Sequence, residues 1–488
     1  MNTPISPPSP AALLETLWRD AGLDARALGR AQLSGSNQRL PSSFAVGQAA
    51  QASVAAAALA ASEIGALRQP HLPAQGVAVA MEHVLAETSA FFTLDGVRPS
   101  IWSPVSGLYA CGAALGRPGW VRIHANFDHH RDGVLRLLGL PPGENTSKQQ
   151  VSQALQAKDA LDFEAKATAA GLVVAAVRSL QEWEAHAQSA ALRAQPLVSI
   201  TQLDAGAPAA PRAWPALAAD ALPLSGLRVL DLTRILAGPV AARTLAAYGA
   251  EVLMVNAPQL PNIEAIADMS RGKRSALLDL KTPAGLAQMR QLLADAHVFV
   301  QGYRPGSLQA LGLGVQDVAR LAPGIVHASL SAYGRSGPWA DKRGFDSLVQ
   351  TVSGINLAEA GAFGDPTPRP LPMQILDYGA GFLLAFGIQA ALLRQAAQGG
   401  TWHVEVSLAR VAQWLVGLGQ VPVVPAADTG TDWLLPYLET AESGFGQLCA
   451  VCPSARLSRT PPRLRRPSVP PGTDQLRWLM HPDDNSGL

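Results

Sequence analysis

The chain has 488 residues, of which 48% are hydrophobic and 15% are charged, and its formal net charge at pH 7 is +1. This length allows two or three domains with substantial cores, and a charge so close to zero gives no reason to expect nucleic acid or an anionic membrane as a partner. Three cysteines do not make a disulfide framework, and the first residues show no basic segment followed by an apolar run. We therefore expect a cytoplasmic protein without a signal peptide.

Helical patterns alternate with short apolar, strand-like segments in the first 200 residues. They lie at residues 43–68, 106–111, 119–123, 131–138 and 151–183. We therefore predict a helical N-terminal region over residues 1–105, followed by a small α+β domain over residues 106–203.

Residues 204–223 are dominated by Pro and Ala and contain few periodic apolar residues, which is typical of a linker. Residues 224–421 then form the largest patterned unit. Beyond it, the Pro- and Arg-rich residues 422–488 predict a partly ordered C-terminal tail.

The clearest module of the chain begins at residue 229. An apolar run at 229–232 precedes a turn with Gly238 and Pro239, an Ala-rich helical pattern follows, and a second apolar run occupies 252–255. This order predicts a βαβ unit of a parallel sheet, hence an α/β fold. Ligands on such sheets bind beyond the carboxyl ends of the strands, where helix N-termini offer N–H groups to phosphates. The turn lacks the G-x-G-x-x-G pattern, so a nicotinamide cofactor is not favoured.

A long apolar segment at residues 378–393 is too short to span a bilayer comfortably, which favours a buried core helix. Residues 44–61 resemble residues 377–394 without a gap, and Phe44 then corresponds to Asp377. Ala-rich helices often match by chance, so an internal duplication and a chance match both remain open.

Five sequence blocks and one Asp occur together in the second half of the chain. The blocks are 224–239, 272–281, 303–306, 331–338 and 344–346, and Asp377 follows ahead of Gly379 and Gly381. In this order they resemble the family III CoA-transferases, the CaiB/BaiF group that includes formyl-CoA and carnitine CoA-transferases. The resemblance implies a Rossmann-like, parallel-sheet CoA-binding domain over residues 224–421 plus a smaller α+β domain. It also implies coenzyme A or acyl-CoA as a substrate, with no tightly bound cofactor.

The resemblance places the catalytic nucleophile at Asp377. An Asp that opens an apolar helix is most often an N-cap, and both roles can coexist. In the implied reaction the carboxylate attacks an acyl-CoA thioester, an aspartyl anhydride and then an aspartyl-CoA thioester form, and an acceptor carboxylic acid takes the CoA. We expect Gly379 and Gly381 to leave room for the thioester.

The resemblance also implies a set of CoA contacts. These are Leu236, Ala237, Lys273, Tyr303, Arg304 and Arg343. A Lys point charge suits a phosphate, although Lys273 and Arg274 could equally be a solvated pair. Gly302, Asn256 and Ala310 depart from the residues usual in the family, which predicts an altered affinity for CoA.

Two other functions remain open. Acyl-CoA racemases of the same family pair the Asp with a His just before the Asp of the Gly-x-Asp block, where this chain has Phe345. Without a second acid or base, two-sided proton exchange lacks a partner. The second alternative is a non-catalytic acyl-CoA-binding protein.

The small domain precedes the CoA-binding domain in this chain, whereas it follows in the family. Together with the similarity of the two Ala-rich helices, this suggests a fused or circularly reordered chain with one catalytic site. Because family members form interlocked dimers, we expect either a homodimer or an intrachain pseudo-dimer.

The remaining motifs predict no further site. His124, His129 and His130 lie near one another in sequence, but no matching Cys or carboxylate cluster stands at ligand spacing, so we expect surface histidines and no metal. Cys449 and Cys452 have redox-motif spacing in an alternating apolar segment, which favours buried thiols.

Overall fold

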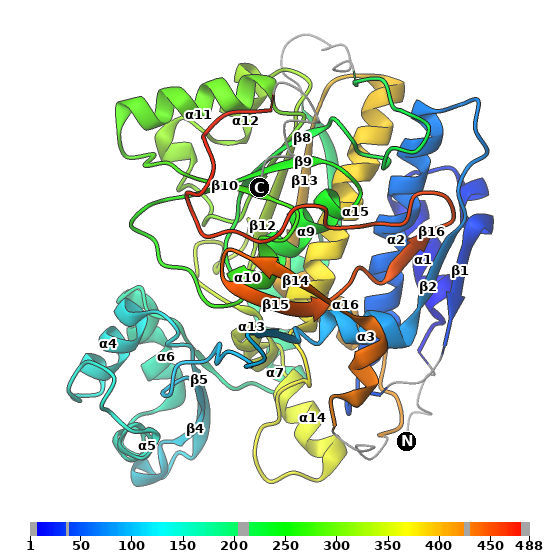
Figure 1. Cartoon of the computed structure of the whole chain (residues 1–488). Coiled ribbons are helices and arrows are strands. Elements are labelled where there is room, and N and C mark those ends of the chain that lie inside the picture. Colours follow the sequence, from blue (N-terminus) through cyan, green and yellow to red (C-terminus); the bar gives the residue numbers. More distant parts are fainter. Residues whose placement is uncertain (1–6, 36–38, 204–213, 424–429, 480–488) are drawn as a thin grey trace.

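The computed structural model describes residues 7–35, 39–203, 214–423 and 430–479. Most of the expected linker, residues 204–213, lies outside the described residues. Figure 1 shows a large sheet with its helices, a second layer of N-terminal helices and strands beside it, and a small domain set apart from both.

The largest sheet has seven strands in the order β10, β9, β8, β11, β12, β13, β7. Their bounds are β7 Ser199–Leu203, β8 Arg228–Leu232, β9 Glu251–Asn256, β10 Arg274–Leu277, β11 Val298–Gln301, β12 Val326–Ser331 and β13 Thr401–Ser407. Six strands are parallel, whereas β7 runs antiparallel to β13. The strand order reverses between β8 and β11, as in doubly wound nucleotide-binding sheets. The predicted α/β fold with a Rossmann-like parallel sheet is confirmed.

Helices cover both faces of this sheet. They are α9 Ala237–Ala247, α10 Ile266–Met269, α11 Pro283–Asp295, α12 Val315–Leu321 and α15 Ile375–Gln398. Along β8, Val229 packs in the core that contains α9 and α15, while Leu230 packs in the core that contains α11 and α12. Successive side chains of a strand point to opposite faces, so a strand covered on both sides must be apolar throughout.

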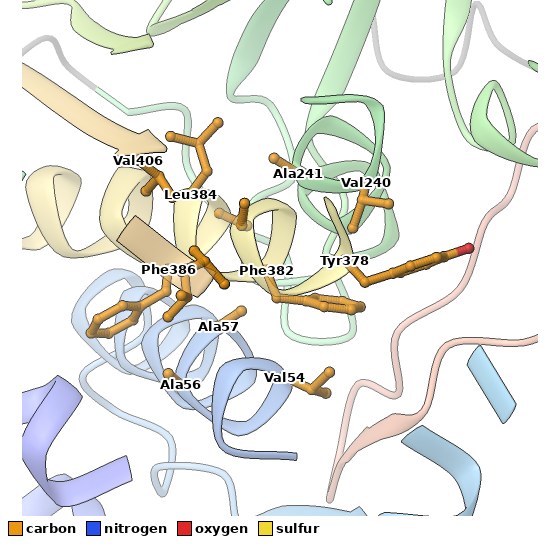
Figure 2. Packing of buried hydrophobic residues seen from close by; sticks show 14 of the residues in the cluster. Val54, Ala56, Ala57, Val240, Ala241, Tyr378, Phe382, Leu384, Phe386 and Val406 are labelled. Carbon is orange, nitrogen blue, oxygen red and sulfur yellow. The ribbon is translucent and has the colours of Figure 1, made fainter. Parts of the chain in front are cut away.

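Helix α15 lies between α9 and a second Ala-rich helix, α2 Val46–Arg68 (Figure 2). Both α2 and α15 are long and apolar enough to cross a membrane by composition, but 83% and 94% of their most apolar windows are buried in the chain. The predicted core helix is therefore present. A Cβ on Gly381 would come within 2.6 Å of the Ala237 carbonyl oxygen, so this glycine lets α15 approach α9 closely.

The elements around α2 repeat those around α15. Helix α2 connects two parallel strands, β1 Ala31–Ser34 and β2 Val77–Ala80, and β16 Ala455–Leu457 pairs antiparallel with β2. In the same way α15 leads into β13, which is parallel to β12 and antiparallel to β7. The two groups of elements therefore have a common strand arrangement.

The small domain has its own core beneath an antiparallel sheet, β4 to β6. Its elements are β4 Gly107–Cys111, β5 Gly119–Ile123, α4 Asp128–Leu137, α5 Lys148–Leu155, α6 Ala160–Ala169 and β6 Val174–Ala176. Helices α7 Leu180–Ala185 and α8 Ala187–Arg193 then lead to β7. The strands predicted at 106–111 and 119–123 and the helix predicted at 131–138 are present.

The segment after residue 421 differs from the tail that its composition predicts. Within it, β14 Leu438–Ser443 and β15 Gly446–Val451 form a sheet with β3 Phe92–Leu94, and β16 joins the sheet of β1 and β2. Pairing with distant strands satisfies the backbone of this segment, and a composition argument does not register such pairing.

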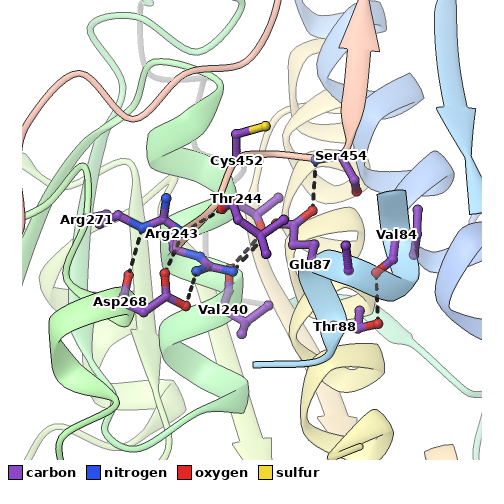
Figure 3. Close-up of polar contacts among 12 residues, drawn as sticks. Val84, Glu87, Thr88, Val240, Arg243, Thr244, Asp268, Arg271, Cys452 and Ser454 are labelled. Atoms are coloured by element: carbon purple, nitrogen blue, oxygen red, sulfur yellow. Dashed lines mark hydrogen bonds and ion pairs between the residues drawn. The ribbon is translucent and has the colours of Figure 1, made fainter. Parts of the chain in front are cut away.

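A buried ionic cluster joins this segment to the rest of the chain (Figure 3). Arg243 of α9 contacts Asp268 at 2.6 Å and Glu87 at 3.5 Å, while Arg271 contacts Asp268 and, at 2.9 Å, Glu439 of β14. Glu87 belongs to α3 Met81–Thr88 and also accepts the backbone N–H of Ser454. Buried charges need such pairing, so the cluster specifies how these three segments meet.

Candidate active site

A cleft of about 410 Å³ opens at the carboxyl ends of β8, β11 and β12, next to the point where the strand order reverses. This is where ligands bind on doubly wound sheets. Six of the seven predicted site residues line it: Leu236, Ala237, Tyr303, Arg304, Arg343 and Asp377. Segments far apart in the sequence therefore meet at one site.

The N-terminus of α9 forms one wall of the cleft. Its N-cap residue, Leu236, makes no side-chain capping hydrogen bond, so the first-turn N–H groups are suited to a phosphate or a developing oxyanion. The preceding Ile235 has a φ of 77°, which is an outlier for a β-branched residue and costs about 1–3 kcal/mol. Such strain persists only where the surroundings impose it, here at a residue that lines the cleft.

Asp377 lies in the first turn of α15 and is 9% exposed. It is not the N-cap that the sequence suggested, because Gln374 occupies that position. The backbone N–H of Asp377 donates to Asp346 Oδ2 at 2.9 Å. Burial and the neighbouring Asp346 carboxylate raise the pKa of Asp377 well above its usual value, and burial raises the pKa of Asp346 to about 6. Two carboxyl groups so placed resist joint ionisation.

Lys273 does not reach the cleft. It is 0% exposed, and its Nζ donates to Asp231 Oδ2 at 2.9 Å and to the Pro239 carbonyl at 3.0 Å. Both the expected phosphate contact and the solvated-pair alternative are wrong. Lys273 instead joins β8 to the first turn of α9, which positions the helix end that lines the cleft.

The small domain contributes histidines to the cleft. His129 and His130 line it, and Arg343 Nη1 donates to His130 Nε2 at 3.1 Å. Burial and nearby positive charges lower the pKa of His130 to about 3, so its ring is neutral and can accept this bond. His124 and His130 are each only 4% exposed, so the expectation of surface histidines is wrong for both. No group of three metal-ligating side chains is found in the described part of the chain.

The cationic groups at the cleft differ in how firmly they are held. Lys342 donates to Glu164 at 2.7 Å and lies 3.7 Å from the Trp339 ring centre, so it is engaged within the protein. Arg304 is exposed at the rim, where it can meet a phosphate. Arg234, which the sequence analysis did not select, also lines the cleft. Its place two residues after the end of β8 was the signal that could have found it.

A second, smaller cavity of about 50 Å³ adjoins the same carboxyl group. Ile235, Leu236, Phe345 and Asp377 line both spaces, so Asp377 lies where the two meet. The ring of Phe345 stacks on that of His124 at 4.0 Å between centres and an angle of 12°. Sequence reasoning missed this cavity because its walls come from the N-terminal region, the small domain and the large sheet.

The other noted residues have separate roles. Gly302 lines the cleft, whereas Asn256 is 2% exposed and its amide has no hydrogen-bond partner among the described residues. Gly379 and Gly381 line neither space beside Asp377, so the expected room for a thioester is wrong. Cys449 and Cys452 are free thiols of intermediate exposure, not fully buried.

Comparisons with known proteins assign part of the chain. Residues 224–421, about two fifths of the chain, match the model of CoA-transferase family III. An acyl-CoA transferase of Gibberella moniliformis is 31% identical over 304 residues, covering 59% of this chain and 53% of that protein. The succinyl-CoA:glutarate CoA-transferase of Mus musculus is 34% identical over 200 residues, covering 38% and 45%.

A hypothetical protein of Mycobacterium tuberculosis with a solved structure is 35% identical, with coverage of 41% of this chain and 58% of that one and a TM-score of 0.37. The chain spans about half the length of the curated relatives it matches.

Proposed function

We propose that this protein is a CoA-transferase that moves coenzyme A from an acyl-CoA donor to a carboxylic acid acceptor, with Asp377 as nucleophile. The observation that supports it best is the position of Asp377. Its carboxyl group lies in the first turn of a helix, between a cleft large enough for part of a CoA chain and a small cavity. The match of residues 224–421 to family III and the CoA-transferase names of several relatives support the same reaction.

In the first half of the proposed reaction, the Asp377 carboxylate attacks the thioester carbonyl of the donor. The C–S bond breaks, an acyl-aspartyl anhydride forms, and CoA leaves as a thiolate. The thiolate then attacks the aspartyl carbonyl, which releases the donor acid as a carboxylate and leaves an aspartyl-CoA thioester. No net proton transfer is needed.

The second half reverses these steps with a different acid. The acceptor carboxylate attacks the aspartyl thioester, the thiolate leaves, and it then attacks the acceptor carbonyl of the new anhydride. Acyl-CoA product departs and the Asp377 carboxylate is restored. The first-turn N–H groups of α9 can stabilise the oxyanions that develop in each step.

The cleft supplies the groups that would hold CoA in this scheme. Leu236 and Ala237 present the helix end, Tyr303 lines the wall, and Arg304 and Arg343 offer positive charge to phosphates. Since CoA is the substrate, the scheme needs no resident cofactor.

Trapping the covalent intermediate tests the proposal. The full chain is incubated with a panel of acyl-CoAs, quenched with hydroxylamine or borohydride, and digested for peptide mass spectrometry, with Asp377→Ala as the control. Modification confined to Asp377 is the expected result. Binding of CoA without modification by any donor would contradict the transferase and favour an acyl-CoA-binding protein.

One observation favours a second candidate, racemisation of acyl-CoA. The imidazole of His124 stacks on Phe345, the position where a racemase would carry its His, and it lines the small cavity together with Asp377. Incorporation of deuterium from heavy water at Cα of an acyl-CoA, lost in His124→Leu but without aspartyl modification, would support this candidate over the transferase.

The proposal extends to assembly and location. The repeated elements around α2 and α15 support a pseudo-dimer within one chain, and the three free thiols fit a reducing cytoplasm. Sedimentation of the full chain as a stable homodimer would contradict a self-sufficient pseudo-dimer.

A further inference from the structure

The small cavity beside Asp377 has a limited volume. Its 50 Å³ holds roughly three to five water-sized atoms if each needs about 10–15 Å³. An acyl group that extends from a thioester at Asp377 therefore has room for only a short chain before it meets the walls.

Those walls are mainly apolar and come from three parts of the chain. Phe92, Ile101 and Trp102 belong to the N-terminal region, and Ile263 and Met269 belong to the segment of the large sheet. The small domain contributes His124 and Asn126. No Lys or Arg occurs among the described residues that line this cavity. Among the described residues, the acidic side chains that line the cavity are those of Asp377 and Asp268.

Three arginines near these walls are engaged by other groups. Arg122 lies over the ring of Trp102, with its guanidinium carbon 5.3 Å from the ring centre. Arg243 is held between Asp268 and Glu87 (Figure 3). Arg271 is held between Asp268 and Glu439. His124 cannot replace them, because burial lowers its pKa to about 3 and leaves the ring neutral. A carboxylate at the far end of an acyl chain would therefore enter the cavity without a counter-ion.

The cavity does offer uncharged hydrogen-bonding groups. Ser347 is 3% exposed and His124 is 4% exposed, and both line it. Neither Ser347 Oγ nor His124 Nδ1 has a hydrogen-bond partner among the described residues. The hydroxyl of Tyr378, which also lines the cavity, is likewise unpaired in the described part of the chain. Buried polar atoms are normally paired, so unpaired ones around a ligand-sized space indicate a polar group on the ligand.

We propose that this cavity is the acyl subsite and that it selects short, uncharged acyl groups that bear a hydroxyl or keto oxygen, against dicarboxylic acyl groups such as succinyl. This inference rests on the proposed function, because it places the thioester at Asp377. It distinguishes this chain from the relatives whose names specify succinyl-CoA and glutarate.

The test compares donors of matched shape on the full chain. 4-Oxopentanoyl-CoA and succinyl-CoA are nearly isosteric and differ by the terminal charge, so their kcat/KM ratio reports charge alone. We expect 4-oxopentanoyl-CoA to exceed succinyl-CoA by at least about 100-fold, and octanoyl-CoA to react at least about tenfold more slowly than butanoyl-CoA. A succinyl-CoA rate equal to or above the oxo analogue would overturn the proposal.

Two variants sharpen the test. Ile101→Arg places a cation at the cavity wall and is expected to raise the succinyl-to-oxopentanoyl ratio at least tenfold, whereas Ile101→Met is expected to leave that ratio as it is. Ser347→Ala is expected to lower kcat/KM for 3-hydroxybutanoyl-CoA or 4-oxopentanoyl-CoA by about 2- to 12-fold without a matching loss for butanoyl-CoA. An equal loss of kcat/KM for all donors would show that Ser347 makes no specific contact with the oxygen of the acyl group.

Failure of this inference differs from failure of the proposed function. If succinyl-CoA labels Asp377 best, the transferase stands and the subsite assignment falls. If no donor labels Asp377, the proposed function falls first. Folding of each variant is checked by its thermal midpoint, and the donor panel on the unmodified protein stands without any variant.

Discussion

A buried carboxylate accepts a backbone N–H near the start of both α15 and α2, but the two starts differ. Asp377 is the third residue of α15, whereas Phe44 precedes Ala45, the N-cap of α2. At α15, a buried carboxylate from α13 Asp346–Val352 accepts the backbone N–H of Asp377. At α2, the Glu359 carboxylate of α14 Ile355–Phe363 accepts the backbone N–H of Ser43 at 2.8 Å. The residue that corresponds to Asp377 is Phe44, which is 1% exposed within the hydrophobic core.

The comparison shows what a site needs beyond a helix end and a carboxylate. At α15 the corresponding position carries a carboxyl group that lines two cavities, and its pKa is raised by burial and by Asp346. At α2 an aromatic ring packs there, and Glu359 is occupied by Ser42 and Ser43. An aromatic ring fills the space at Phe44, whereas the carboxyl group of Asp377 borders open space.

Removing the distinguishing carboxyl group should have the largest effect. Asp377→Ala is expected to reduce kcat for CoA transfer by about 10⁴-fold or more, because no nucleophile remains. Initial rates with a donor that labels Asp377 provide the measurement, and circular dichroism provides the folding control. Retention of activity within tenfold of the unmodified chain would show that the covalent route is wrong.

A carboxyl group placed at residue 44, just before α2, should lower the stability of the protein without creating a second reactive site. Phe44→Asp is expected to lower the free energy of unfolding by more than about 4 kcal/mol, because a large buried ring is lost and an unpaired charge is buried. Phe44→Leu is the matched control and should cost less than about 2 kcal/mol. Urea unfolding measures both, and labelling of a second carboxyl group in Phe44→Asp would break the comparison.

A substitution of Lys273 tests whether this residue holds the start of α9 in place beside the cleft. Lys273→Ala leaves Asp231 buried without its partner and is expected to cost about 3–5 kcal/mol of stability. Lys281 is exposed, so Lys281→Ala should change stability by less than about 0.5 kcal/mol. A raised KM for CoA with unchanged stability in Lys273→Ala would restore the phosphate role that the sequence suggested.

The sequence predicted the large module well because its signals are local. Apolar runs such as 229–232 and Gly turns define the βαβ unit, and parallel strands bring their carboxyl ends to one edge. Six of the seven site residues that the family resemblance implied line the cleft at this edge.

The failures depend on contacts between distant segments. Lys273 appeared exposed because its partner Asp231 lies in another strand, in the middle of an apolar run. His124 appeared exposed because Phe345, which covers it, comes from another domain. Strands β14 to β16 are short and pair with β3 and β2, so Pro and Arg dominated the pattern of their segment. Periodicity does not encode such partners.

The smallest predicted effect concerns pH and compares the two buried carboxylates directly. In the proposed reaction Asp377 must be ionised. Burial and the Asp346 charge raise the pKa of Asp377, so kcat/KM should fall on the acid side. Asp346→Asn removes the like charge and keeps an acceptor for the Asp377 N–H. The fall of kcat/KM on the acid side is therefore expected to occur at lower pH in this variant. The pH-independent value of kcat/KM should change by at most about tenfold. Glu359→Gln, the equivalent change at α2, should leave this acid limb in place.

Stability provides the second readout for the same variant. Because the folded pKa of Asp346 is raised from 3.8 to about 6, the folded state holds a proton that the unfolded chain releases over that range. The free energy of unfolding should therefore fall as pH rises from about 4 to 6, and Asp346→Asn should flatten this slope. Two results would contradict this comparison of the two helix starts. One is an acid limb of the kcat/KM profile that moves to higher pH in Asp346→Asn. The other is a loss of the pH dependence of the free energy of unfolding in Glu359→Gln as large as that in Asp346→Asn.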